Sequence, residues 1–143
     1  MKLRIATLIF SFFTLLASQV LAEAIPLSYK EMYNVTSRGL QFSKRLTSLK
    51  GQQIKMVGFM APPLTPTINF FVLAEEPMAI CPFCSTDADW PDNIIVVKLE
   101  KPVVALPFDR PIIVEGMLEI GSEVDAETGF VSQVRIRAKN IKE

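Results

Sequence analysis

The chain has 143 residues, of which 50% are hydrophobic and 21% charged, with 15 basic and 15 acidic side chains and no histidine. This length suits one domain, and a charge fraction this low excludes an intrinsically disordered chain. The neutral balance gives no global electrostatic reason to bind nucleic acid or an anionic membrane. Because histidine is absent, Ser-His-Asp and Cys-His catalytic arrangements and His-ligated metal sites are excluded.

The first 22 residues are typical of a secretory signal peptide. Lys2 and Arg4 form a positive start, an apolar run follows from Ile5 to Ala17, and small residues end the segment at Ala22. The run is too short for a membrane anchor, since a spanning helix needs about 20 apolar residues. Without residues 1–22 the chain keeps 13 basic and 15 acidic side chains. We therefore expect an exported, periplasmic protein of net charge −2, with no stable membrane insertion after cleavage.

The mature chain divides into a short N-terminal segment and a strand-rich remainder. Between Tyr29 and Leu49, apolar residues recur among lysines and arginines, which predicts one or two short helices broken near Gly39. Strands are predicted at Gln53–Met60, Ile68–Ala74, Ile94–Leu99, Ile112–Ile120 and Val131–Ala138. The predicted organisation is a signal peptide at 1–22, an N-terminal helical segment at 23–50 and a β domain at 51–143.

Alternation within the strands predicts which residues form the core. The first strand places Ile54, Met56 and Met60 on one face, and Gly58 marks a bend. In the last strand Val134 and Ile136 alternate with polar residues, as in a half-buried antiparallel strand. A polar loop at residues 121–129 makes the last two strands a hairpin. We expect a mainly β protein, a small five-stranded antiparallel OB-like barrel with a short N-terminal helical segment.

Three stretches carry a family resemblance: the run Leu49–Met60 (LKGQQIKMVGFM), then Phe70–Leu73 (FFVL), then Cys81 before a strand. Over about residues 46–141 the chain resembles a family of exported bacterial OB-fold-like proteins of largely unknown function. The resemblance implies a binding role in an envelope transport or metal-handling system. It supplies no catalytic residues.

The segment with the most chemistry is Cys81–Trp90, which contains both cysteines, the single tryptophan and two acids. Cys81 and Cys84 are two residues apart, a spacing that suits a local disulfide or two ligands on one metal. In the metal interpretation, Asp87 and Asp89 add oxygen ligands to the two thiolates and form a weak, exchangeable site for zinc or copper. No other cofactor is expected.

Two other interpretations of the cysteines stay open. The Cys-Pro-aromatic-Cys sequence resembles that of glutaredoxins, which implies a thiol-disulfide oxidoreductase with Cys81 as nucleophile and Cys84 as resolving thiol. Against this, Asp87 and Asp89 would raise a nearby thiol pKa, and the surrounding sequence has no βαβ pattern. Alternatively, the pair forms a purely structural disulfide in a protein-interaction module, as the oxidising periplasm favours.

Aromatic and charged side chains outside the cysteine pair are weaker candidates. Trp90 is a partner-binding candidate, although a tryptophan beside prolines often only plugs a loop. Charged side chains gather along the last two strands and the hairpin between them, and we expect them to be solvated, with contact of the basic ones to anionic lipid or an acidic partner as the alternative. The basic members are Arg135, Arg137, Lys139 and Lys142, and the acidic ones are Glu115, Glu119, Glu123, Asp125 and Glu127. The sequence therefore predicts an exported, non-enzymatic binding protein whose functional end is the cysteine segment.

Overall fold

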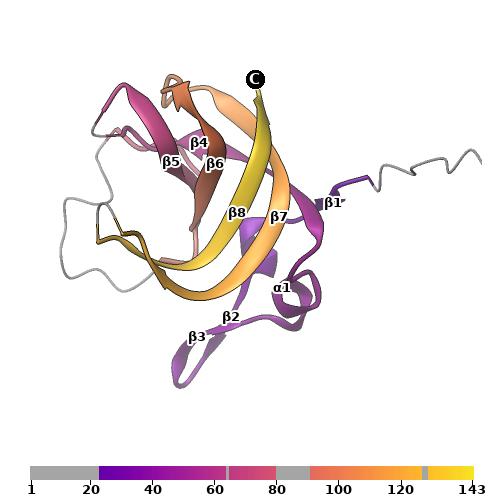
Figure 1. Cartoon of the computed structure of the whole chain (residues 1–143). Coiled ribbons are helices and arrows are strands. Elements are labelled where there is room, and N and C mark those ends of the chain that lie inside the picture. The colour runs from indigo at the N-terminus through magenta and orange to yellow at the C-terminus, as the bar shows by residue number, and fades with distance from the viewer. Residues whose placement is uncertain (1–22, 64, 80–90, 127–128) are drawn as a thin grey trace, which may run out of the picture.

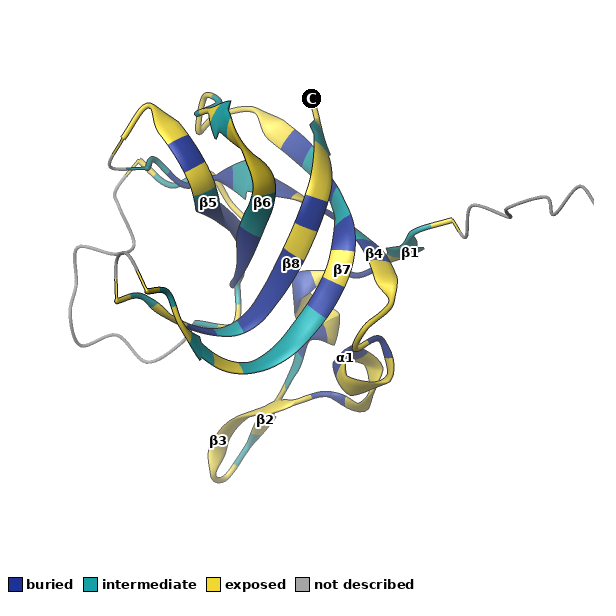
Figure 2. Ribbon diagram, viewed as in Figure 1, coloured by how far each residue is buried: buried dark blue, intermediate teal, exposed yellow. Residues whose placement is uncertain are grey.

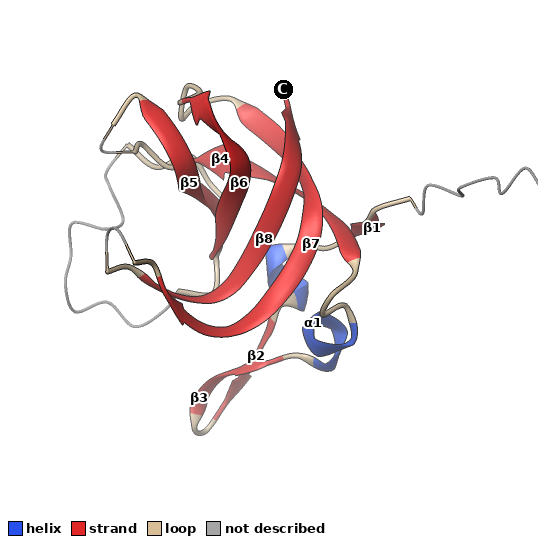
Figure 3. Cartoon of the chain, in the orientation of Figure 1, coloured by secondary structure: helices blue, strands red, loops and turns tan. Residues whose placement is uncertain are grey.

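The structure is a computed structural model, and it describes residues 23–63, 65–79, 91–126 and 129–143. Strands dominate these residues (Figure 3). The main sheet contains β1 (Ile25–Pro26), β4 (Gln53–Met60), β5 (Thr67–Ala74), β6 (Ile94–Val104), β7 (Pro111–Val124) and β8 (Val131–Lys142). The mainly β prediction is confirmed. No helix among the described residues is long and apolar enough to cross a membrane.

The strand order of the main sheet is β1-β4-β5-β6-β8-β7, and β4 also pairs with β7 (Figure 1). Strand pairing therefore runs from β4 through β5, β6, β8 and β7 back to β4. The β4–β5 seam is short, with only Phe59 opposite Ala74 and Met60 opposite Leu73. The prediction that all strands are antiparallel is wrong, because β6 runs parallel to β8. The sheet is mixed because β8 inserts between β6 and β7 instead of following β7 at the edge.

Strand β4 has the predicted bounds and the predicted faces. Ile54, Met56 and Met60 are buried, whereas Val57 is exposed. Gly58 is required by a close approach, since a Cβ atom there would clash with the Tyr29 hydroxyl group and lie 2.6 Å from the Ala74 carbonyl oxygen. The glycine therefore lets Tyr29 pack directly over the strand.

The predicted N-terminal helical segment is wrong over its middle part. A 3-10 helix, η1 (Tyr29–Glu31), and a short helix, α1 (Lys44–Ser48), flank an antiparallel hairpin of β2 (Tyr33–Thr36) and β3 (Gly39–Phe42). Apolar residues in both strands alternate with a period of two, and Gly39 has the positive φ of 96° that suits its turn. Over so few residues, this alternation cannot be told from a helical pattern in the sequence.

The other strands are longer than predicted. Strand β6 continues through Pro102 to Val104, and β7 continues past Gly121, where φ is 127° and the pairing with β8 shifts register. The polar loop predicted at residues 121–129 is therefore wrong in its first part, because β7 continues to Val124, and Glu123 and Val124 pair with β8. A glycine with positive φ bends this strand without ending it.

Apolar side chains form two clusters on opposite faces of β5 and β6. Inward-facing side chains, Phe71 and Val97 among them, belong to the main core. The alternate residues form an outer cluster, defined by Ala61, Val72, Ala74, Ile94 and Val96, with Phe70, Met78 and Phe130 packed against it. Figure 2 shows buried residues along both strands. Burial on both faces explains why these strands read as nearly continuous apolar runs.

Candidate functional site

The site residues predicted from the sequence, Cys81, Cys84, Asp87, Asp89 and Trp90, lie outside the described residues, and their roles stay predictions. The chain on either side of this segment is held together: the Glu75 amide donates a hydrogen bond to the Asn93 carbonyl oxygen at 3.0 Å. Met78 packs against the outer cluster. Within the described part of the chain, no three metal-ligating side chains of the His, Cys, Asp or Glu type are grouped to hold an ion.

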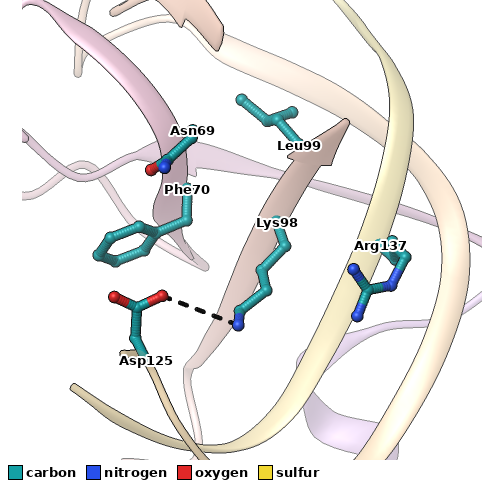
Figure 4. A pocket seen from close by; sticks show the side chains of 6 residues that line it. All are labelled: Asn69, Phe70, Lys98, Leu99, Asp125 and Arg137. Atoms are coloured by element: carbon teal, nitrogen blue, oxygen red, sulfur yellow. Dashed lines mark ion pairs between the residues drawn. The ribbon is translucent and has the colours of Figure 1, made fainter. Parts of the chain in front are cut away.

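A hollow of about 190 Å³ lies on the outer face of the sheet (Figure 4). Strands β5, β6 and β8 and the residue that follows β7 line it with Asn69, Phe70, Lys98, Leu99, Asp125 and Arg137. Of this group, only Asp125 and Arg137 are among the charged side chains considered from the sequence, where both are expected to be solvated.

Strand register explains why distant residues meet in the hollow. Phe70 lies opposite Lys98 on β5 and β6, and Lys98 lies opposite Arg137 on β6 and β8. Their sequence neighbours, including Phe71, Val97 and Ile136, point into the main core. An aromatic ring, an ammonium group and a guanidinium group therefore form one row across three adjacent strands, here termed the site row.

Carboxylates of β7 and the residue after it hold the two cations of the site row. Lys98 Nζ donates to Glu123 and lies 3.8 Å from Asp125 Oδ2. Arg137 donates through Nε to Glu119 at 2.9 Å and through Nη2 to the same carboxylate at 3.3 Å. The hydrogen bond from Arg137 lowers the pKa of Glu119, and that from Lys98 lowers the pKa of Glu123. Both carboxylates are therefore ionised at neutral pH.

Arg135 lies behind this network and is 5% exposed. Its Nη1 donates to the carbonyl oxygens of Gly121 at 2.8 Å and Ser132 at 3.0 Å. Its Nε lies 3.4 Å from Glu119 and 3.2 Å from Glu123. The prediction of a solvated basic stripe is wrong at Arg135, which is buried. Glu119 and Glu123 stay partly exposed, but cross-strand pairing brings them into contact with cations, which the sequence did not predict.

The hollow is connected to the ends of the cysteine segment. Phe130, which precedes β8, stacks on Phe70 with ring centroids 6.4 Å apart and an interplanar angle of 22°. Both rings pack against the outer cluster, which also contacts Met78. One apolar cluster therefore supports the hollow and the chain that leads into residues 80–90.

The hollow combines charged, polar and aromatic side chains. Hydrogen bonds from Arg137 to Glu119 raise the pKa of the guanidinium group, so Arg137 stays a cation. Lys98 is paired with Glu123. The lining of the hollow includes an aromatic ring, an amide, a carboxylate and the half-exposed end of Arg137. Side chains of these types can interact with other groups by stacking and hydrogen bonding.

Comparison with known proteins supports the fold alone. No protein-family model matches the chain, and no curated protein sequence matches it. Among solved structures it is similar to a DUF3299 family protein from Pseudomonas aeruginosa, with a TM-score of 0.57 and 16% sequence identity. The match covers 83% of this chain and 95% of that one. The neighbour thus comes from a family of unknown function, in keeping with the resemblance seen in the sequence.

Proposed function

We propose that the chain is an exported, non-enzymatic binding protein with an OB-like barrel, and that its ligand binds in the hollow. Strands β4 to β8 correspond to strands one to five of such a barrel. OB folds bind ligands on the face of strands two and three and with the loops after the first and fourth strands. The hollow lies on the outer face of β5 and β6, and Asp125 directly follows β7. The site row of Phe70, Lys98 and Arg137 is the observation that carries this proposal.

The side chains of the hollow favour a ligand that combines a flat apolar face with an acidic group. The Phe70 ring is partly exposed and supported from behind by Phe130. Arg137 uses Nε and Nη2 on Glu119, which leaves Nη1 for a ligand. A guanidinium edge in the same row as an aromatic face, two strands away from it, suits a ligand that carries a carboxylate at a distance from an aromatic or sugar ring.

This proposal is tested by titrating the purified protein with acidic dipeptides that carry one aromatic side chain and following backbone amide signals by NMR. We expect shifts at Asn69, Phe70 and Lys98, and a loss of affinity of about tenfold in Arg137→Gln. Lys139→Gln, an exposed change on the same strand, is the matched control and should leave the affinity unchanged. Shifts that spare the hollow, or equal affinity in both variants, would contradict the proposal.

We also propose that the cysteine segment adds a metal site to this end of the molecule, in service of an envelope transport or metal-handling protein. Cys81 and Cys84 would supply thiolates and Asp87 and Asp89 oxygen ligands to zinc or copper. This proposal comes from the sequence. The hydrogen bond between Glu75 and Asn93 holds together the two chain segments on either side of residues 80–90, which is compatible with it.

The metal proposal is tested by purifying the periplasmic protein under thiol-blocking conditions and measuring intact mass and bound metal together. Free thiols with bound zinc or copper, lost in the double variant Asp87→Asn and Asp89→Asn but kept in Asp92→Asn, would support it. A mass two hydrogens lighter without metal would contradict it. Reduction of insulin that needs both cysteines and tolerates loss of both acids would instead identify an oxidoreductase, and a disulfide with no such activity would be structural.

A further inference from the structure

The hairpin of β2 and β3 is a two-stranded sheet of its own, separate from the main sheet. It extends away from the strands of the body (Figure 1), and most of its surface is exposed (Figure 2). The turn at its tip is ordered by the Thr36 hydroxyl group, which donates to the Gly39 carbonyl oxygen at 2.9 Å and accepts from the Arg38 amide at 3.2 Å. The hairpin is thus a defined projection.

One face of the hairpin is apolar. Tyr33 lies opposite Phe42, and Val35 lies opposite Leu40, so these four side chains share one face. The Tyr33 and Phe42 rings are 5.8 Å apart. Val35 is 83% exposed and Leu40 41%. The remaining positions of both strands are polar or glycine, so the hairpin is amphipathic.

Charge is strongly segregated between residues 27–50, which contain the hairpin and are here termed the arm, and residues 51–143, here termed the body. The total charge of the chain is nevertheless near zero. Residues 27–50 contain five basic side chains and one acidic side chain, whereas residues 51–143 contain eight basic and thirteen acidic side chains. In the described structure, Glu31 pairs with Arg45, and no carboxylate lies within ion-pair distance of Lys30, Arg38 or Lys44. Arg38 lies in the turn at the tip of the hairpin, and Lys44 begins the helix that follows it.

We propose that this hairpin docks the protein on an anionic lipid surface, with Val35 and Leu40 entering the interface and Arg38, Lys30 and Lys44 contacting the headgroups. Exposed apolar side chains flanked by unpaired cations are the combination that binds anionic bilayers at their interface. Aromatic rings such as Tyr33 and Phe42 are enriched at that depth. The acidic body would be repelled by the same surface, which leaves the arm as the point of contact.

The size of the hairpin argues against a protein partner. Four residues at ~3.3 Å each, on two strands ~4.8 Å apart, offer a face on the order of 130 Å². A stable protein interface needs about 800 Å² on each partner, so the hairpin alone is too small. Shallow insertion into a bilayer has no such requirement.

The test is a flotation assay with the protein as purified from the cells that produce and process it. One set of vesicles contains phosphatidylglycerol and phosphatidylcholine, and the other contains phosphatidylcholine alone. We expect binding to the anionic vesicles only, weakened by salt. The double variant Val35→Ser and Leu40→Ser should lower vesicle affinity about tenfold or more. Its matched control, Val104→Ser and Val131→Ser, removes two exposed valines from the body and should bind as the wild type does.

A second pair of variants keeps the proposal testable if the apolar change disturbs folding. Arg38→Gln with Lys44→Gln should also lower affinity about tenfold or more, whereas Lys101→Gln with Lys139→Gln, the same charge change on the body, should not. Equal binding to neutral vesicles, equal loss in the body variants, or no vesicle binding at all would overturn the proposal. If the protein does not bind vesicles but is retained on an immobilised acidic protein, and the hairpin variants lose this retention, the hairpin would instead have a protein partner. None of these outcomes bears on the hollow, because the two sites share no residue.

Discussion

Arg135 and Glu119 lie opposite each other in the register of β8 and β7, with Arg135 Nε 3.4 Å from a Glu119 carboxylate oxygen. The guanidinium group is buried, and it also donates a hydrogen bond to the Gly121 carbonyl oxygen at the bend of β7. Glu119 in turn holds Arg137, a member of the site row. One buried cation therefore links the bend of a strand to the geometry of the hollow.

Replacing Arg135 should be the most destabilising charge change in the network. Arg135→Met leaves the carbonyl oxygens of Gly121 and Ser132 without this donor and removes one of the cationic partners of both Glu119 and Glu123, and we expect a loss of about 3 kcal/mol in the free energy of unfolding. Arg137→Met, a half-exposed residue on the same strand, should cost less than about 1 kcal/mol. Urea unfolding followed by circular dichroism measures both, and equal losses would contradict a structural role specific to Arg135.

Stability should also depend on pH through Glu119 and Glu123. The pKa of each carboxyl group is lowered from its ordinary value of 4.5, by hydrogen bonds from Arg137 and Lys98 respectively. A carboxyl group whose pKa is lower in the folded state stabilises the fold above its unfolded pKa, and that contribution is lost as the pH falls through the folded value. The free energy of unfolding should therefore be steady near neutrality and decline below about pH 4.5.

Glu119→Gln and Glu123→Gln provide the matching test. Each variant should be less stable at neutral pH and show a shallower decline between about pH 4.5 and pH 2 than the wild type. Glu143→Gln, which lies outside the network, should follow the wild-type curve. The measurement is the urea midpoint of unfolding at each pH in this range. If the midpoints of the wild type and of the two variants fall in parallel with pH, Glu119 and Glu123 do not cause the pH dependence of stability.

Local patterns in the sequence predicted β4 well. Its eight residues alternate so regularly that bounds and faces both agree with the structure. The hairpin of β2 and β3 was missed because four-residue strands contain only two apolar positions each, too few to separate a period of two from a helical period. The mixed sheet could not be predicted either, because the insertion of β8 beside β6 is a long-range choice that no local pattern encodes.

The candidate site was harder to predict than the strands. Phe70, Lys98 and Arg137 come from three strands, and only the register places them in one row. The burial of Arg135 has the same origin, since its glutamate partners on β7 are identified only when the pairing is known. The residues that the sequence did single out, from Cys81 to Trp90, carry their chemistry in a short motif that can be recognised without the fold.

Gly58→Ala should destabilise the protein strongly. The added methyl group would meet the Tyr29 hydroxyl group, the Ala74 carbonyl oxygen at 2.6 Å and the Leu73 side chain at 2.9 Å, distances that require the strand or η1 to move. We expect a loss of about 3 kcal/mol, whereas Val57→Ala, an exposed change at the adjacent position, should stay within about 0.5 kcal/mol. Thermal unfolding of the two variants side by side measures this, and a Gly58→Ala protein as stable as Val57→Ala would mean that the close approach does not exist.

Tyr29→Phe should leave stability unchanged or raise it. The Tyr29 hydroxyl oxygen is buried and has no hydrogen-bond partner within the described structure. Its burial raises the pKa of Tyr29, with a smaller contribution from Glu75, so the phenol stays protonated. Because an unsatisfied buried hydroxyl group costs about 1–3 kcal/mol, its removal should be neutral or stabilising by up to about 1 kcal/mol after the lost packing is counted. Urea unfolding of Tyr29→Phe measures this, with Tyr33→Phe, the same chemical change in the hairpin, for comparison. A clear loss of stability in Tyr29→Phe alone would show that the buried hydroxyl group has a hydrogen-bond partner.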